Sequence, residues 1–66
     1  MPRVHVQLSS TALRSCAYDG ETQALDVTFA SGRVFTYEGV PQDVFEGLRD
    51  APSPGSYYHA NIKDAY

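Results

Sequence analysis

The stretch LDVTFASGRVFTY, residues 25–37, decides the fold because it holds two strand-like segments joined by a short turn. Leu25, Val27 and Phe29 alternate with polar residues, and Phe35 and Tyr37 alternate in the same way after the turn. This period of two is typical of a β-strand with one apolar face. The stretch therefore predicts a β-hairpin, and the length of its loop decides which face carries the two later aromatic rings.

Two loop lengths are compatible with this turn. A two-residue loop, Ser31-Gly32, places Phe35 and Tyr37 on the polar face, where they form an exposed platform. A three-residue loop, 30–32, places them on the apolar face instead. The longer loop is favoured, because it asks only Gly32 to adopt a positive φ and gathers the apolar side chains on one face. We therefore expect both rings in the core, and an exposed Phe35 would contradict that expectation.

The remaining N-terminal segments extend this hairpin into a meander. Residues 3–8 alternate between polar and apolar types, and a bend follows at 9–11. The segment 12–18 is less regular and needs a bulge near Arg14-Ser15 to bring its apolar residues to one side. Because all connections are short, an antiparallel meander is the expected arrangement.

The C-terminal half changes to helical spacing. Pro41 suits a first helical turn, and the apolar residues within 44–48 lie on one face. The prolines that follow end this helix at or before residue 51. Ser53 then precedes a second short helix, whose expected inward residues are Tyr58 and Ile62.

The fold class predicted from these patterns is α+β, with an antiparallel β-meander of three to four strands followed by two short helices packed on one face. We expect one domain over residues 1–66, because this length supports one small core. The predicted core consists of the apolar residues on the inward faces: Leu13, Tyr18, Leu25, Val27, Phe29, Phe35, Tyr37, Val44, Phe45, Leu48, Tyr58 and Ile62.

Composition limits the classes of function. Five basic residues against eight acidic ones give a net charge of −3, which lowers the expectation of a nucleic-acid partner without removing it. The single cysteine forms no internal disulfide. The sequence shows neither an apolar signal core nor a stretch of membrane-spanning length, so a cytoplasmic location and no membrane partner are expected.

No constellation of residues predicts an enzyme. Cys16 with His5 or His59 has no spacing typical of a nucleophile and its base, and Cys16 occupies an inward strand position, where a buried structural thiol is expected. The scattered histidines and cysteine do not make a zinc motif, and a glycine-rich phosphate loop is missing. We therefore expect no catalytic residues, no metal and no small-molecule cofactor.

The order of these features resembles the KTSC domain family, which is named for the lysyl-tRNA synthetase C-terminus and includes stand-alone bacterial or phage proteins. The resemblance runs from residue 9 to residue 66 and rests on SSTALRSCAYDGETQALDVTFASG, FTY, GVP and APSPGSYYHANIKDAY. The family's central Tyr-x-Tyr motif falls on Phe35-Thr36-Tyr37, so that phenylalanine replaces the first tyrosine. The family has no established activity, and the resemblance implies RNA association.

Two classes of function stay open at this point. One is a small non-enzymatic module that binds RNA, either tRNA or a single strand. The alternative is a protein–protein interaction module, such as a bacterial or phage regulatory accessory protein. The side chains expected to contact either partner are Arg14, Arg33, Tyr37, Tyr57, His59 and Lys63. For Tyr57 and His59 on the second helix, two roles are equally favoured: contact with a partner, or cover over the sheet edge.

Overall fold

The computed structural model describes residues 3–8 and 10–66, and it confirms the α+β class. Ser9, which belongs to the predicted bend, lies outside the described residues. The four strands are β1 (Val4–Gln7), β2 (Leu13–Asp19), β3 (Ala24–Phe29) and β4 (Val34–Tyr37). The helices that follow are α1 (Gln42–Asp50) and α2 (Pro54–Asn61).

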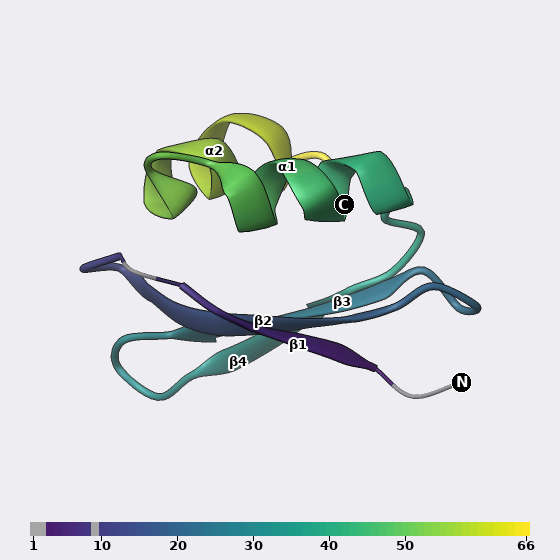
Figure 1. Ribbon diagram of the computed structural model, residues 1–66, viewed down its shortest axis with the longest axis horizontal. Helices are drawn as coiled ribbons and strands as arrows, with labels where there is room; N and C mark the ends of the chain where they lie inside the picture. The colour runs from purple at the N-terminus through teal and green to yellow at the C-terminus, as the bar shows by residue number, and fades with distance from the viewer. Residues whose placement is uncertain (1–2, 9) are drawn as a thin grey trace.

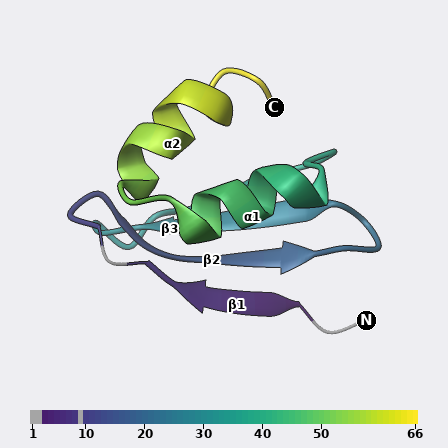
Figure 2. The same cartoon turned by 45° about the horizontal axis from the view of Figure 1, so that its top comes forward.

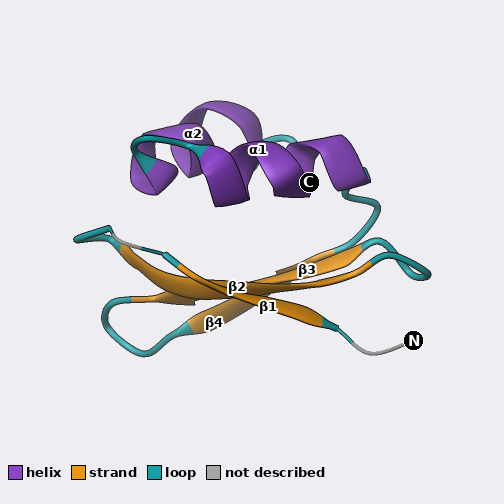
Figure 3. Ribbon diagram, viewed as in Figure 1, coloured by secondary structure: helices purple, strands orange, loops and turns teal. Residues whose placement is uncertain are grey.

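The strands form one antiparallel sheet in the order β1-β2-β3-β4. Both helices lie on the same side of this sheet, so the fold has a strand layer and a helix layer (Figures 1 and 3). Figure 2 shows the strands beneath α1, with β1 at one edge. The register shifts between Leu13 and Ser15, which confirms the predicted bulge. A meander of this kind leaves its first and last strands, β1 and β4, as the two edges.

The loop between β3 and β4 has the predicted three residues. Gly32 has a φ of +96°, and the Phe29 N–H donates a hydrogen bond to the Arg33 carbonyl at 2.8 Å. The register then places Phe35 opposite Val27 and Tyr37 opposite Leu25. The inference that Phe35 and Tyr37 lie on the helix-covered face is therefore correct.

The helices begin and end close to the predicted positions. Pro41 precedes α1 in an extended conformation, so the helix starts one residue later than the sequence indicates. The helix ends at Asp50, within the predicted limit. Ser53 is the N-cap residue of α2, but its hydroxyl bonds to the Ser56 hydroxyl at 3.2 Å and caps no backbone N–H.

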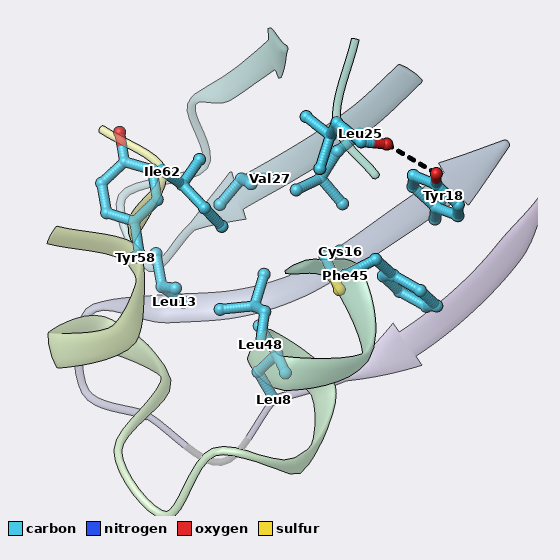
Figure 4. Packing of buried hydrophobic residues seen from close by; sticks show 11 residues of the cluster. Leu8, Leu13, Cys16, Tyr18, Leu25, Val27, Phe45, Leu48, Tyr58 and Ile62 are labelled. Carbon is cyan, nitrogen blue, oxygen red and sulfur yellow. Dashed lines mark hydrogen bonds between the residues drawn. The ribbon is translucent and has the colours of Figure 1, made fainter. Parts of the chain in front are cut away.

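The core fills the space between the two layers and has an aromatic group at each end. Figure 4 shows Tyr58 beside Ile62 at one end of the cluster, and Tyr18 with Phe45 at the other. The rings of Tyr18 and Phe45 stack at 4.7 Å, and the Tyr18 hydroxyl donates to the Val40 carbonyl at 2.6 Å. Cys16 is buried, as its inward strand position predicts, and two buried residues outside the predicted set complete the core: Leu8 and Val40.

The predicted burial of Phe35 is wrong. Its side chain is 45% exposed, although it points to the apolar face. The reason is that β4 is an edge strand, in which no residue is buried, whereas β2 and β3 supply buried residues beneath the helices. Sharing a face with the core therefore does not make Phe35 part of it. Three other predicted core residues are only partly buried: Phe29, Tyr37 and Val44.

Candidate binding site: an aromatic edge on strand β4

Five rings form a connected cluster where β3 and β4 meet α2, and we call this cluster the aromatic edge. Its members are Phe29, Phe35, Tyr37, Tyr58 and His59. Phe29 contacts both Phe35 and Tyr58 edge to face, each at 5.3 Å between ring centroids. Tyr58 contacts Tyr37 at 6.0 Å and His59 at 5.6 Å. Such edge-to-face pairs hold rings in defined orientations, so the cluster is preorganised.

Tyr58 is the buried centre of the aromatic edge. Only 4% of its surface is exposed, and its hydroxyl forms a hydrogen bond with the Tyr37 hydroxyl. Burial, with the Tyr37 hydrogen bond as the second cause, raises the pKa of Tyr58 to about 12. The phenol is therefore neutral at physiological pH. This uncharged hydrogen bond joins α2 to the edge strand.

Phe35 and His59 are the solvent-exposed members of the cluster, and Tyr37 is half-buried. Phe29 contacts Phe35, and the buried Tyr58 contacts Tyr37 and His59, so each outer group is held by a ring beside it. An exposed aromatic ring held in place by its neighbours can stack with a nucleic-acid base or contact an apolar group of a protein. The candidate site is thus a surface, and no pocket opens among residues 3–8 and 10–66.

Three cationic residues lie close in the fold to members of the aromatic edge. Arg33 directly precedes β4, and its carbonyl accepts the hydrogen bond from the Phe29 N–H. The Arg14 guanidinium donates to the Ala30 carbonyl at 3.1 Å, which places it at the same turn. Lys63 follows α2, and its backbone N–H donates to the Tyr58 carbonyl at 2.9 Å.

These three cations differ from the other two arginines of the chain. Arg3 pairs with Asp26, and Arg49 pairs with Asp50 at 2.9 Å. Within the described part of the chain, no ion pair involves Arg14, Arg33 or Lys63. Their charges are therefore available to an anionic ligand.

The structure separates Tyr57 from the other predicted site residues. Tyr57 is half-buried and packs against α1, where a Cβ on Gly47 would lie 2.1 Å from the Tyr57 hydroxyl oxygen. It therefore fills the contact between the helices. The remaining predicted residues lie on or beside the aromatic edge: Arg14, Arg33, Tyr37, His59 and Lys63.

Sequence reasoning missed Phe35 as a surface residue and Phe29 as its support. A signal for Phe35 was available, because the last strand of a meander is an edge strand by topology. No comparable signal identified the ring contacts. They depend on where α2 crosses the sheet.

The other face of the sheet offers a different surface. Asp26 accepts hydrogen bonds from Arg3 and from the Thr36 hydroxyl, the latter at 2.6 Å. His5 and Ala17 pair on this same face. No phenylalanine or tyrosine of β1 to β4 lies there, and His5 is the one ring that these strands place on this face.

The KTSC domain family matches residues 9–66 of the sequence. The chain belongs to this family. An uncharacterised protein of Stutzerimonas stutzeri is 43% identical over 88% of this chain and 82% of that protein. A lysine–tRNA ligase of Trichormus variabilis is 41% identical over 82% of this chain, but over only 10% of its own length.

The crystal structure of a KTSC domain protein from Yersinia pestis has the same fold. It superposes with a TM-score of 0.91 at 25% identity, covering 97% of this chain and 90% of the other. The KTSC domain thus occurs both in small proteins and within lysine–tRNA ligases. In the part of this KTSC domain that the structure describes, neither helix has the length and apolar character needed to cross a membrane.

Proposed function

We propose that this KTSC domain is a small non-enzymatic binding module that holds single-stranded RNA on its aromatic edge. The observation that carries the proposal is the exposed ring of Phe35, supported by Phe29 and flanked by unpaired cations. Base stacking on such a ring contributes about 1–3 kcal/mol per base.

A single strand fits this surface better than a double helix does. Bases must leave their own stack before they can lie against a protein ring, and loops or single strands allow this. The two exposed rings, Phe35 and His59, are connected through Phe29 and Tyr58, so each can take a base of the same strand. The neighbouring phosphates would meet Arg33 beside Phe29 and Lys63 after α2.

The relatives support RNA as the nucleic acid. Three of the similar proteins are named lysine–tRNA ligases, and the matching segment is about a tenth of their length. The net charge of −3 supports a modest affinity, because few phosphates can be neutralised. With three available cations, log K should fall with log salt with a slope of about −2.

Fluorescence anisotropy with a labelled oligouridine and with tRNA, at about 50 mM salt, tests the proposal where electrostatic contacts are strong. We expect Phe35→Ala to weaken binding by roughly 5- to 150-fold, the loss of one stacked base. Val34→Ala is the matched control. It alters the adjacent exposed residue, whose side chain points to the opposite face. The proposal would be refuted if neither the oligouridine nor the tRNA bound detectably. Equal losses of affinity in Phe35→Ala and Val34→Ala would also refute it.

The salt dependence provides a second measurement on the same samples. Removing one phosphate contact should make the slope less steep by about 0.7 for a single strand. We expect this change for Arg33→Ala and for Lys63→Ala, whereas Arg49→Ala, which alters an arginine already paired with Asp50, should leave the slope unchanged.

The alternative function is a protein–protein interaction module, and the open edge of β4 is the observation that favours it. An extended segment of another protein can add to such an edge by main-chain hydrogen bonds. A pull-down whose partners persist after nuclease treatment, combined with absent RNA binding, would favour this alternative.

A further inference from the structure

Strand β4 presents an open and unprotected sheet edge. The side chains of Val34 and Phe35 are 55% and 45% exposed, on opposite faces of the sheet. Natural proteins usually protect such an edge with a proline, a lysine or a bulge. Residues Val34–Tyr37 contain none of these, so the strand is suited to pairing with another strand.

The direction of the main-chain groups follows from the ladder with β3. The Phe29 N–H bonds to the Arg33 carbonyl, so Arg33 directs its main-chain groups towards β3. Hydrogen-bonded and non-hydrogen-bonded pairs alternate along an antiparallel ladder. Phe35 therefore also faces β3, whereas the N–H and C=O groups of Val34 and Thr36 point to the open edge.

We propose that β4 pairs antiparallel with β4 of a second copy of this chain, with Phe35 opposite Phe35 of that copy. In this register Val34 lies opposite Thr36 of the second copy, and Thr36 lies opposite Val34 of the second copy. Because both residues direct their main-chain N–H and C=O groups to the open edge, these two pairs form the main-chain hydrogen bonds between the copies. Phe35 occupies a non-hydrogen-bonded position, where opposing side chains come closest.

Self-complementarity favours a second copy over an unrelated strand. The register covers both exposed apolar side chains of β4 at once, with ring against ring on one face and Val34 against the Thr36 methyl on the other. It also places Arg33 opposite Tyr37 of the second copy, a cation beside an aromatic ring. Of the two neighbouring registers, the one centred on Thr36 would place Val34 opposite Glu38, which buries the apolar side chain poorly. The one centred on Val34 would place Thr36 opposite Gly32, which lies in the loop before β4 at a positive φ.

The symmetry of this pairing is compatible with the helix layer. A two-fold axis perpendicular to the sheet keeps the helices of both copies on one side and joins the four strands of each copy into one continuous sheet. The interface is small, and each copy has a net charge of −3, so association should be weak and should strengthen with salt. RNA binding should show the opposite salt dependence.

Sedimentation velocity without nucleic acid tests the proposal, over roughly 10 µM to 1 mM protein, the range where weak interfaces associate. We expect a monomer–dimer equilibrium that shifts towards dimer as salt rises. Val34→Pro should abolish it by removing an outward N–H at the start of an edge strand, a position that tolerates proline. A monomer at all concentrations, or a dimer that survives Val34→Pro, would refute the proposal.

His5→Pro is the control for this variant. The Leu8 N–H bonds to the Arg14 carbonyl, so alternation along β1 directs the main-chain groups of His5 to the other sheet edge. The control should therefore keep the dimer. Loss of the dimer in His5→Pro alone would place the interface on β1 and overturn the proposal.

Cysteine cross-linking measures the register directly. In a Cys16→Ala background, Phe35→Cys places two thiols opposite each other in a non-hydrogen-bonded pair, at about 4.5 Å between Cα atoms, which suits a disulfide. We expect rapid disulfide-linked dimer formation on oxidation. Thr36→Cys is the matched variant, and faster cross-linking of Thr36→Cys would overturn the proposed register.

Discussion

The hydroxyl group of Tyr58, on α2, forms a hydrogen bond with β4 and so connects the helix layer to the sheet. Its ring is buried in the core, while its hydroxyl bonds to Tyr37 on the edge strand. The same ring contacts Phe29 and His59, so it positions the exposed part of the aromatic edge without being exposed itself. A change at this residue should therefore alter stability and the candidate site together.

Tyr58→Phe tests this role through pH. The folded-state pKa of Tyr58 is about 12, above the ordinary value of about 10, so its contribution to stability is complete below pH 10 and is lost as pH rises towards 12. We expect Tyr58→Phe to cost about 1 kcal/mol at pH 8, because the Tyr37 hydroxyl loses its partner. Between pH 10 and 12 its stability should fall less than that of the unmodified chain.

Urea denaturation at several pH values measures both effects. Tyr66→Phe is the matched control, because the Tyr66 side chain is exposed and outside the core. A parallel decline of Tyr58→Phe and the unmodified chain above pH 10 would show that ionisation of another group causes the alkaline loss.

At the scale of elements, the two helices meet through a glycine and an aromatic ring. Gly47 of α1 leaves the space that Tyr57 of α2 fills. The Gly47–Tyr57 contact explains why Tyr57, unlike its neighbour His59, does not extend to solvent. The close approach of the helices therefore depends on the absence of a side chain at residue 47.

A double-mutant cycle tests this contact. A Cβ on Gly47 would lie 2.1 Å from the Tyr57 hydroxyl oxygen, 2.5 Å from the ring carbon Cζ and 2.9 Å from Cε2, so the whole ring must move. We expect Gly47→Ala to destabilise the chain by about 1–3 kcal/mol, as overpacking does. In a Tyr57→Ala background the same change should stabilise by about 0.5–1 kcal/mol, because alanine is the better helix former.

Chemical denaturation measures whether the effect of Gly47→Ala on the free energy of unfolding changes sign between the unmodified chain and the Tyr57→Ala variant. Gly20→Ala is a control outside the helices, because a Cβ there meets only a Tyr18 ring atom at 4.0 Å. An equal effect of Gly47→Ala in both backgrounds would contradict the Gly47–Tyr57 contact.

The whole molecule is a single sheet covered on one side, with its one thiol at the centre of the core. Cys16 lies between Val6 and Val27 in the sheet and is buried beneath the helices. Burial raises the pKa of Cys16 to about 11, so the thiol stays protonated at neutral pH. Its reaction with a thiol reagent should require the two layers to separate.

Labelling kinetics with a thiol reagent at pH 8 check this expectation. We expect the native chain to react slowly and at a rate that follows global opening, and to react at once in denaturing urea. A Cys16→Ala/Ser31→Cys variant, with its thiol in the exposed β3–β4 loop, should react immediately without urea. Fast labelling of Cys16 in the native chain would show that the core opens locally.

Local patterns were sufficient for the backbone. Alternation along residues 25–37, together with Gly32, predicted the hairpin, its three-residue loop and its register, because a slip of one residue would split the apolar side chains between two faces. Proline positions likewise predicted where α1 ends. These features depend on near neighbours, which a sequence displays directly.

Exposure of side chains at the candidate site, unlike the course of the backbone, did not follow from near neighbours in the sequence. The sequence by itself determined that Phe35 lies on the apolar face and that Arg33 follows a turn. Only the tertiary structure decided that Phe35 is exposed, that Tyr57 is packed away and that Tyr58 supports the aromatic edge. The physical reason is that burial depends on where the helix layer stops above the sheet, and this boundary is set by packing between segments distant in the chain.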